Sequence, residues 1–536
     1  MKRTILLYAF SLFIVSCKIK TNSQVAQQKP NIIYIMADDL TIQAISAYGG
    51  IYKDIAPTPN IDRLAKEGIL MEDVLCTNAI CGPSRAAILT GKHSNINGFY
   101  KNQYGGQFNA EQWTFPQEFK NHSYQTSLFG KWHLGTNPVG FDMFKFHASS
   151  DQQGNYWNPI YNENGVEVKE KGYATNITTN FALDWLDKGR DKSKPFLMLL
   201  QYKAPHRPWE PDTKYEKLWD DIEMPYPATF NDDYKGRELT AGDTEMTMEH
   251  FSRRDLKLLA PDALKGKERL DWNFYGVKND QIVQPEVMSK EEGRKWRYQI
   301  YIKDYLACVK SVDDNIGMVL KYLDDNNLTE NTMVVLTSDQ GFYLGDHGFF
   351  DKRFIYEESL RMPFIVRYPK VIKAGTVNSD IISNVDFATT FLDIAGVKSI
   401  EKVQGKSFKK ILEGNTPSNW DQAMYYHYYE FPLWHHVQPH YGIRTQKYTL
   451  AHFYYSIDVW ELFDLEKDPK QVKNIINEPE YKEVIIKLKS KLRELMKKNG
   501  DDKTIAQFRE ITEKDFGTIT ERGGKDDLNS IIDRKK

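Results

Sequence analysis

The chain has 536 residues, long enough for one large α/β domain and a smaller one, because a single hydrophobic core rarely grows beyond about 300 residues. Lysine and arginine total 71, aspartate and glutamate total 73, and the formal net charge is -2. A nucleic-acid-binding protein usually carries a basic surplus. We therefore expect no nucleic-acid partner, and any anionic ligand must be bound by a local group of cations.

Residues 1–17 begin with basic side chains and continue with an apolar run that is too short for an ordinary transmembrane helix. This pattern predicts an export signal. Its last residues, Ile14-Val15-Ser16-Cys17, resemble a bacterial lipobox, so we expect cleavage before Cys17 and a lipid on Cys17 that anchors the protein to a membrane. The alternative is a plain signal peptide cut nearer Gln24. We expect an exported protein of the bacterial cell envelope, either periplasmic or on the cell surface.

The folded part of the chain is expected to begin with a strand. Residues 18–30 are mostly polar and predict a tether, whereas residues 31–36 are almost all apolar, as in a strand buried on both faces. Residues 298–323 repeat apolar side chains every three and four positions and predict a long helix, with a buried strand after it at 333–337. We expect an α/β domain over residues 31–396, a mostly parallel sheet covered by helices on both faces. Further helices are predicted at 58–68 and from 85 to 90, and further strands at 127–130 and 196–201.

Other parts of the chain depart from this alternation. Residues 231–295 are polar and without clear periodicity, and we expect a long insertion that wraps the surface as a substrate rim or as passive decoration. Residues 397–500 carry short aromatic-rich runs and then a helical pattern, which predict a smaller C-terminal α+β subdomain. We expect the charged tail at 501–536 to be loosely ordered.

Polar side chains follow two of the predicted buried strands. Asp38 and Asp39 come shortly after residues 31–36, and Asp339-Gln340 comes shortly after residues 333–337. The carboxyl ends of parallel strands meet at one edge of a sheet, where ligands bind. Adjacent carboxylates there call for a cation, and hard oxygen ligands suit calcium or magnesium better than zinc. Each pair alone is more often a turn former or a helix cap, but the two together favour a metal site.

The most informative motif is Cys81-Gly82-Pro83-Ser84-Arg85, followed by Leu89-Thr90-Gly91-Lys92. Both parts, at this spacing, resemble the maturation motif of the formylglycine-dependent sulfatases of the alkaline phosphatase superfamily. The resemblance runs from residue 31 to the segment Glu461–Pro469 and implies that family's fold. The alternative is a structural cysteine buried before a helix, which would leave the downstream match unexplained.

The resemblance implies covalent chemistry at Cys81. In the family a formylglycine-generating maturase converts this cysteine to an aldehyde, and one hydroxyl of its hydrate, polarised by one Ca²⁺ ion, attacks the sulfur of a sulfate ester. The start of a helix suits this anionic chemistry because its amides and the helix dipole favour negative charge. Cys81 would join Asp38, Asp39, Asp339 and Gln340 as a metal ligand. Many members carry Asn where this chain has Gln340, whose longer side chain can still offer an amide oxygen.

Three further segments resemble the family's sulfate pocket: Gly130–His133, Ala204–His206 and Phe350–Lys352. They imply that Lys131 and Lys352 bind sulfate oxygens and that His206 protonates the leaving alcohol, alone or with Lys352. His133 would take a proton from the second hydroxyl, which expels sulfate and regenerates the aldehyde. Arg85 would hold the modified residue and offset its charge. Taken singly, each of these side chains is more simply a solvated surface group.

The stretch of residues 425–441 is the expected substrate rim, because the subdomain overhangs the pocket in related sulfatases. The candidate sugar contacts are His427, Glu430, His440 and Arg444, although strand packing explains each of them as well. Segments within and beside this stretch look like those of glycan sulfatases of the N-acetylglucosamine-6-sulfatase kind. The expected substrate is a sulfated carbohydrate, either algal, such as ulvan or carrageenan, or of the glycosaminoglycan or mucin type.

Two other functions fit parts of this pattern. Phosphonate and phosphodiester hydrolases of the same superfamily share the fold and can use formylglycine, but a single set of metal ligands favours sulfate over a phosphate monoester, which usually needs two metals. An inactive carbohydrate-binding surface protein would not need Cys81 and the pocket cations together. An unmodified Cys81 would favour that alternative.

Four cysteines occur in the chain. Cys17 and Cys81 have the expected fates given above. Cys76 and Cys308 could form a disulfide in an oxidising compartment, or each could be a small buried hydrophobic residue.

Overall fold

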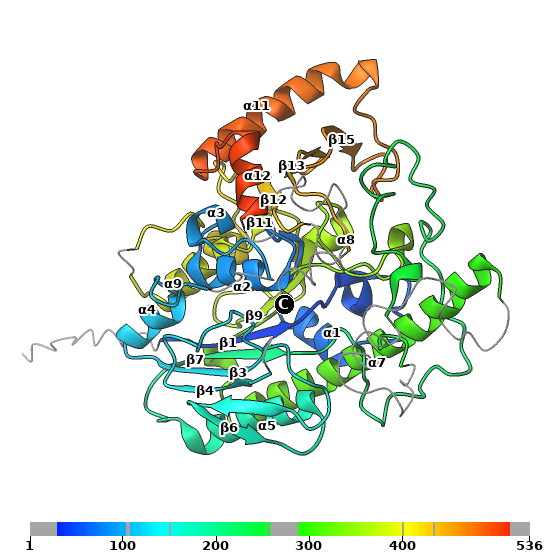
Figure 1. Cartoon of the computed structure of the whole chain (residues 1–536). Coiled ribbons are helices and arrows are strands. Elements are labelled where there is room, and N and C mark those ends of the chain that lie inside the picture. Colours follow the sequence, from blue (N-terminus) through cyan, green and yellow to red (C-terminus); the bar gives the residue numbers. More distant parts are fainter. Residues whose placement is uncertain are drawn as a thin grey trace, which may run out of the picture.

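The computed structural model describes residues 29–102, 108–149, 152–252, 254–257, 288–398, 401–431 and 435–514. An 11-stranded sheet forms the middle of the molecule, in the order β10-β2-β9-β8-β1-β7-β3-β4-β5-β6, with β11 beside β2 (Figure 1). At its centre β1 (Asn31–Ala37) lies parallel to both β7 (Phe196–Tyr202) and β8 (Thr332–Thr337). The other strands of this sheet are β2 (Ile69–Leu75), β3 (Gln125–Gly130), β4 (Met143–His147), β5 (Ile160–Glu163), β6 (Val166–Lys169), β9 (Arg361–Arg367), β10 (Thr376–Asn378) and β11 (Ile382–Ser383).

The central strands are mostly apolar because helices cover both faces of the sheet. Every residue of β1, β7 and β8 is buried. Strands β3, β4, β10 and β11 add further parallel pairs, whereas β9 is antiparallel to β2 and β8, and β5 is antiparallel to β4 and β6. The predicted mostly parallel sheet is therefore confirmed.

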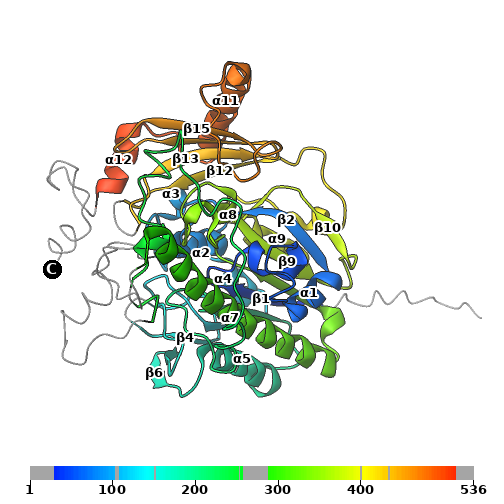
Figure 2. The same cartoon turned by 90° about the vertical axis from the view of Figure 1, so that its right-hand side faces the viewer.

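Two groups of helices make the outer layers. One face is covered by α2 (Cys81–Thr90), α4 (Phe115–Asn121) and α9 (Asp386–Ala395), and the other by α1 (Pro59–Lys66), α5 (Ala174–Asp184) and α7 (Lys290–Asp325) (Figure 2). Alternate residues of β1 supply the two cores, since Tyr34 and Met36 pack with the first group and Ile33 and Ile35 with the second.

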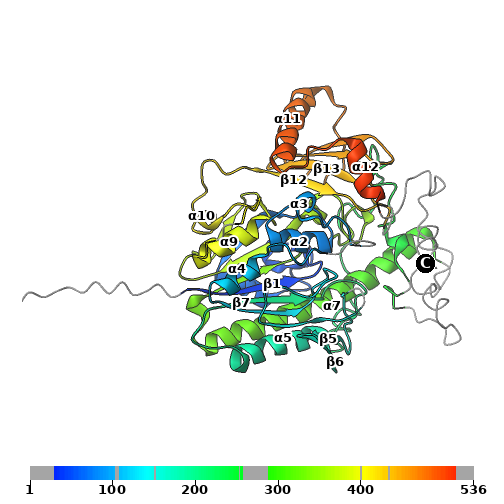
Figure 3. The ribbon, with the colours of Figure 1, turned by 60° about the vertical axis from the view of Figure 1, so that its left-hand side comes forward.

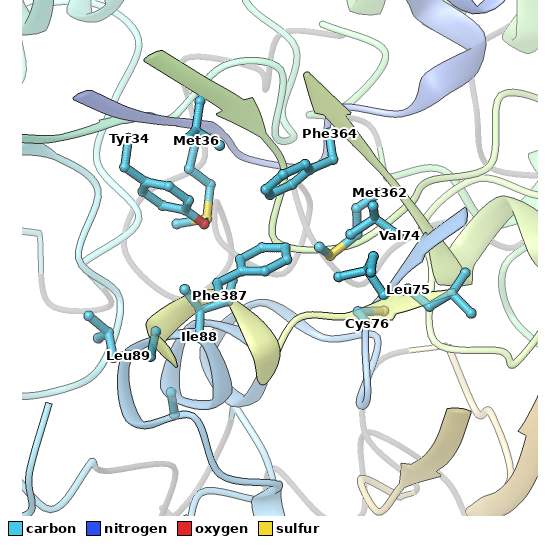
Figure 4. Close-up of a cluster of buried hydrophobic side chains, with 14 of the residues drawn as sticks. Tyr34, Met36, Val74, Leu75, Cys76, Ile88, Leu89, Met362, Phe364 and Phe387 are labelled. Carbon is cyan, nitrogen blue, oxygen red and sulfur yellow. The ribbon is translucent and has the colours of Figure 1, made fainter. Parts of the chain in front are cut away.

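The core under the first group of helices is shown in Figure 4. Ile88 of α2 and Phe387 of α9 face the side chains of β1 and β9, and the rings of Phe387 and Phe364 lie 4.7 Å apart between centroids. All of these side chains are almost fully excluded from solvent. Helix α2 is thus fixed on the sheet by apolar packing along its length.

The C-terminal subdomain is a four-stranded antiparallel sheet that lies above the first group of helices (Figure 3). Helix α11 (Lys482–Lys498) packs on its outer face through Leu488, Leu492 and Leu495. The inner face packs on the large α/β domain, because Tyr426 and Tyr428 belong to the core of that domain. The predicted α+β subdomain is confirmed. Its strands are β12 (Ala423–Tyr428), β13 (His440–Thr445), β14 (Tyr448–Phe453) and β15 (Val459–Asp464), and short helices elsewhere are α3 (Ser94–Asn97), α8 (Glu357–Leu360) and α10 (Lys409–Leu412).

Two expectations about irregular segments are wrong in part. Residues 290–295, predicted as the end of the insertion 231–295, are the first turns of α7, which begins at a capping box of Ser289 and Glu292. In the predicted loose tail, Asp501 is fully buried and α12 (Ile505–Glu513) packs through Phe508. Both segments are rich in charged residues. The few residues that hold them in place do not form the apolar repeat by which a helix is recognised in a sequence.

The cysteines Cys76 and Cys308 are free buried thiols. They belong to the cores on opposite faces of the sheet, so they cannot pair. Among the described residues no helix is long and apolar enough to cross a bilayer. The predicted signal peptide at 1–17, with Cys17, lies outside the described residues.

Candidate active site

The two predicted acidic pairs meet at the carboxyl ends of β1 and β8. Asp39 N–H donates to Asp339 Oδ1 at 3.2 Å, and Gln340 Nε2 lies 2.5 Å from Asp39 Oδ1 and 2.9 Å from Asp339 Oδ1. Asp38, Asp39, Asp339 and Gln340 are all completely buried. The parallel pairing of β1 with β8, in which Met36 lies beside Thr337, brings the two pairs together.

These residues fit a divalent cation. One ligand atom each from Asp38, Cys81 and Asp339 lies within 4.8 Å of the others, and Cys81 Sγ lies 4.0 Å from Asp39 Oδ1. Within the described part of the chain, Asp39 Oδ2 and Gln340 Oε1 are buried without a hydrogen-bond partner. Buried oxygen atoms without partners are costly unless a cation or a donor satisfies them. Three carboxylates and an amide oxygen are the donors expected of a Ca²⁺ or Mg²⁺ site.

Cys81 is the first residue of α2, four residues earlier than the predicted helix start at Arg85. Pro83 fits there because a proline in the first turn removes no hydrogen bond of the helix. Gly82 N–H donates to Asn102 Oδ1 at 2.8 Å, and a Cβ on residue 82 would lie 2.4 Å from a ring carbon of Phe99. Burial raises the pKa of the Cys81 thiol well above its usual value. The cysteine therefore lies, as a neutral thiol, at the positive end of a rigid helix.

Arg85 connects the acidic groups to the sheet. Its Nε donates to Asp339 Oδ2 at 3.0 Å and its Nη2 to Asp38 Oδ1 at 3.3 Å. Its Nη1 donates to Gln201 Oε1 at 3.0 Å and to the Lys131 carbonyl at 3.1 Å. Gln201 was not predicted, because a single glutamine at the end of a buried strand carries no motif. Arg85 is thus fully committed to holding the two carboxylates and the adjoining loop.

Two buried lysines complete the ring of charge. Lys131 Nζ pairs with Asp38 Oδ2, and Lys352 Nζ lies 2.5 Å from Asp39 Oδ1. Burial opposes ionisation of Asp38, but Lys131 and Arg85 outweigh it and hold its pKa well below the usual range. Burial and the neighbouring carboxylates raise the pKa of Asp39 to about 7, because the opposing charge of Lys352 is too weak to cancel them. The lysines are therefore positioned beside the acidic group, and Asp39 is the carboxylate that most needs an added positive charge.

The two predicted histidines lie at the edge of this group. His206 Nε2 is 3.8 Å from Asp39 Oδ2, and its Nδ1 lies 2.6 Å from the Arg207 carbonyl oxygen, so Nδ1 carries the proton. His133 Nε2 lies 3.0 Å from Gln153 Nε2, and in the described part of the chain His133 Nδ1 has no hydrogen-bond partner. Burial and the nearby Lys131 hold the pKa of both histidines well below the usual range. Both are therefore neutral at pH 7, and Gln153 is a neighbour that no sequence motif indicated.

Several residues here adopt left-handed backbone conformations that non-glycine residues rarely take. The φ angles are 63° at Asp39, 56° at His133, 74° at Asp351 and 93° at Arg353. Such residues cluster at functional sites, where the surrounding fold holds them. Asp351 pairs with His435 at 3.2 Å and with Arg353 at 3.3 Å. It lies within the segment Phe350–Lys352 that resembles the family's sulfate pocket, but a role was predicted there for Lys352 alone.

The interpretation of His427, Glu430, His440 and Arg444 as sugar contacts is wrong. All four are at most 4% exposed. Each is bonded inside the protein: His427 to Asp501, Glu430 to Arg353, His440 to the Ile355 amide, and Arg444 to Asp73 and Glu357. The sheet that carries them is covered on both faces, which leaves them no free polar atoms for a substrate.

Comparison with known proteins supports the same chemistry. Residues 30–397 match the family model described as Sulfatase, and residues 345–498 match N-sulphoglucosamine sulphohydrolase, C-terminal. An N-acetylglucosamine-6-O-sulfatase of Bacteroides thetaiotaomicron is 44% identical over 519 residues, which cover 93% of this chain and 91% of the relative. An ulvan-active sulfatase of Formosa agariphila is 26% identical over 513 residues, which cover 93% of this chain and 87% of the relative.

Solved structures share the fold. One, determined in complex with its substrate D-glucosamine-2-N,6-O-disulfate, has a TM-score of 0.82 and 44% identity and covers 89% of this chain and 99% of its own. A phosphonate monoester hydrolase of Agrobacterium radiobacter has a TM-score of 0.67, covering 88% of this chain and 96% of its own, but at 19% identity it shows the fold alone. The family match over residues 30–397 and the 44% identical relative lead to one conclusion: the chain belongs to the sulfatase family and is a sulfuric ester hydrolase.

Proposed function

We propose that this sulfatase removes the 6-O-sulfate of N-acetylglucosamine or N-sulfoglucosamine units of a glycosaminoglycan-type glycan, with formylglycine made from Cys81 as its nucleophile. The 44% identical relative is named an N-acetylglucosamine-6-O-sulfatase, and the most similar of the solved structures above was determined with glucosamine-2-N,6-O-disulfate. The ulvan-active relative is only 26% identical. These similarities favour a glucosamine sulfate over an algal polysaccharide.

The observation that carries the proposal is the position of Cys81. It begins a buried helix, 4.0 Å from Asp39 Oδ1, and Lys131 and Lys352 pair with the same acidic group. A tetrahedral anion placed at the start of α2 would meet the helix amides and two ammonium groups. A structural cysteine in an apolar core would need none of these charges.

A divalent cation would be held by Asp38, Asp39, Asp339 and Gln340, and the oxygen-rich donor set favours Ca²⁺. When bound, such an ion supplies Lewis-acid polarisation and offsets the three carboxylates. Gln340 Oε1, now without a partner, would face the ion after a flip of its amide, which exchanges nearly isosteric groups. With that charge offset, Lys131 and Lys352 would no longer be needed as partners of Asp38 and Asp39, and both ammonium groups would be able to bind sulfate oxygens.

His206 and Lys352 both lie next to Asp39, and we propose that they donate the proton to the leaving alcohol. His206 is kept neutral by burial and by the Lys131 and Lys352 charges. A sulfate ester bound between those lysines offsets their charge and favours the protonated form of His206, which can then donate from Nε2. Lys352, whose pKa is held high against burial by Asp39, is a second proton donor at the same position.

His133 is proposed to act as the base of the second half of the reaction. It is neutral at pH 7, which is the form that accepts a proton. Its Nδ1 is free to take the proton of the second hydroxyl of the formylglycine hydrate, so that sulfate leaves and the aldehyde returns. With the Gln153 amide turned so that its Oε1 accepts the proton on His133 Nε2, an exchange of nearly isosteric groups, Gln153 would fix the orientation of the ring and leave Nδ1 as the basic nitrogen.

The protein's location and maturation are also part of the proposal. Residues 1–17 carry the pattern of an export signal and Cys17 that of a lipidation site, so the enzyme would be lipid-anchored in the bacterial envelope, periplasmic or on the cell surface. A formylglycine-generating maturase is the required partner for Cys81. Membrane fractionation of wild-type protein and of the Cys17→Ala variant tests the anchor, because only the wild-type protein should sediment with membranes.

The substrate is tested with matched glycans. Protein produced with a formylglycine-generating system is incubated with N-acetylglucosamine-6-sulfate, glucosamine-2-N,6-O-disulfate, the corresponding 3-O-sulfated sugars, and ulvan and carrageenan oligosaccharides, and released sulfate is measured. We expect release from the two 6-O-sulfated sugars at a kcat/KM at least about 100-fold above that for the others. Preferential release from an algal oligosaccharide would overturn the assignment of substrate while leaving the sulfatase chemistry intact.

A further inference from the structure

Strand β12 of the C-terminal sheet touches both loops that carry the reactive groups. Tyr426 Oη accepts a hydrogen bond from Ala79 N–H at 3.2 Å and donates one to the Arg353 carbonyl at 2.5 Å. Ala79 lies two residues before Cys81, and Arg353 directly follows Lys352. One phenol group therefore joins the segment that leads into α2 to the segment that carries the catalytic lysine.

Further residues in β12, in β13 and just after β12 add bonds to the same two loops. His427 N–H donates to the Thr77 carbonyl at 3.0 Å, on the Cys81 side. On the Lys352 side, Arg353 Nη1 donates to Glu430 Oε1 at 3.0 Å, and His440 Nε2 accepts from Ile355 N–H at 3.1 Å. Three of the four residues interpreted from the sequence as sugar contacts, His427, Glu430 and His440, thus bind the Cys81 and Lys352 loops from the side of the C-terminal sheet.

The chemistry depends on the spacing of these loops. Helix α2 follows β2 and the Lys352 loop follows β8, and β9 separates β2 from β8 in the sheet. The left-handed backbone at Asp351 and Arg353 shows that the Lys352 loop is held in an unfavourable conformation by its surroundings. Misplacing a catalytic group by about 1 Å can cost about 100-fold in rate. A fixed link between the loops is therefore expected to affect the rate of the reaction as well as the stability of the fold.

We propose that Tyr426 is a positioning residue, which sets the distance between the Cys81 and Lys352 loops and makes the C-terminal subdomain part of the catalytic framework. The inference rests on the proposed function for its kinetic consequence. The simpler alternative is that Tyr426 is a buried tyrosine that stabilises the fold like any other. The two differ in whether loss of one hydroxyl changes turnover.

Tyr425 provides the matched control. It is the preceding residue on β12, is equally buried, and faces the opposite side of the sheet, where its hydroxyl donates to Asp501 Oδ2 at 2.8 Å. Both Tyr426→Phe and Tyr425→Phe remove one buried hydroxyl from the same strand. Only the first removes a bond to the catalytic loops.

The experiment compares kcat, KM, formylglycine content by mass spectrometry and thermal unfolding for wild type, Y426F and Y425F. We expect Y426F to lower kcat per formylglycine by at least about tenfold while KM changes less than about threefold, whereas Y425F keeps kcat within about twofold. Unchanged kcat in Y426F, or equal losses of kcat in both variants, would overturn the positioning role.

A crystal structure of Y426F gives a second readout that does not depend on activity. We expect the Arg353 carbonyl and the Ala79 amide to move apart and the Lys352 loop to shift relative to α2. Loops that superpose on the wild type in every respect would overturn the proposal even if the enzyme proved to have another substrate. A wild-type enzyme that released no sulfate would instead contradict the proposed function, and the structural comparison would still decide on Tyr426.

Discussion

Arg85 Nε donates a hydrogen bond to Asp339 Oδ2 at 3.0 Å, which ties the helix that begins at Cys81 to the loop after β8. Replacing Arg85 by Ala would leave Asp38 and Asp339 buried without this partner. We expect a loss of about 3–5 kcal/mol in the free energy of unfolding, measured with urea. The control is Arg63→Ala, whose partly exposed ion pairs should contribute at most about 1 kcal/mol. Equal effects of the two substitutions would contradict this account.

Lys352→Ala removes one of the two ammonium groups that we propose to bind the reacting sulfate. Loss of a preorganised charge in a buried site costs about 100- to 1,000-fold in kcat. We expect a loss of this size at unchanged formylglycine content, measured by sulfate release. Lys370→Ala changes an exposed lysine on the same domain and should leave kcat unaltered. A K352A enzyme as active as K370A would exclude the role proposed for Lys352.

Calcium binding should depend on pH because of Asp39. Without a cation, burial and the adjoining carboxylates raise the pKa of Asp39 to about 7, so the folded protein keeps a proton that the unfolded chain, with a value near 3.8, has lost. Stability without calcium therefore falls as the pH rises from about 4 to 7. A cation displaces that proton, so affinity for Ca²⁺ should rise between pH 6 and 8.

The measurement is thermal unfolding with and without Ca²⁺ at each pH. Saturation at 100 times the dissociation constant should add about 2.7 kcal/mol. The Asp339→Asn variant should lose this gain. Stabilisation that is the same in D339N and wild type would place the ion elsewhere on the molecule.

The free energy of unfolding should also depend on pH through His440. Burial lowers its pKa from 6.5 to about 3, and it stays neutral while it accepts a hydrogen bond from Ile355 N–H. Below pH 6.5 the His440 imidazole binds a proton in the unfolded chain but not in the folded chain. Stability is therefore lost as the pH falls toward 3. The contribution is about 1.4 kcal/mol per pH unit. Urea unfolding of His440→Phe between pH 6.5 and 4.5 should show a slope shallower by about this amount, and an unchanged slope would contradict the assignment.

Asp501 anchors the C-terminal residues to β12. It is fully buried and accepts hydrogen bonds from Tyr425, Tyr429 and His427, each at 2.8 Å. Asp501→Asn removes the charge that these donors stabilise, and we expect a loss of about 2–4 kcal/mol in the free energy of unfolding, with kcat of the folded enzyme retained. Asp502→Asn, at an exposed neighbouring position, should be neutral. A neutral D501N would mean that this segment contributes little to the fold.

The sequence predicts some parts of this site well because their signals are local. Asp38 and Asp339 end buried strands, and parallel strands bring their carboxyl ends together. Cys81 and Arg85 share one motif on one helix, so their separation is fixed by helix geometry. The apolar runs of β1, β7 and β8 indicate a sheet covered on both faces.

Other parts depend on contacts that no local pattern contains. The aromatic run from Tyr425 to Glu430 looks the same whether its second face meets solvent or another layer, and here it meets the catalytic domain. Gln153 and Gln201 are single polar residues that belong to no sequence motif. Asp501 lies in a charged segment, and only the three donors around it reveal that it is buried. These features follow from tertiary packing rather than from propensity or spacing.

The role of Cys81 is tested by mass spectrometry of the peptide that contains it, from protein produced with a formylglycine-generating system. Sulfate release from N-acetylglucosamine-6-sulfate is measured on the same sample. Cys81→Ala serves as the control, because it cannot form the aldehyde. We predict an aldehyde at residue 81 and sulfate release in proportion to it, with none from C81A. Sulfate release by C81A, or an unmodified Cys81 in an active enzyme, would contradict it.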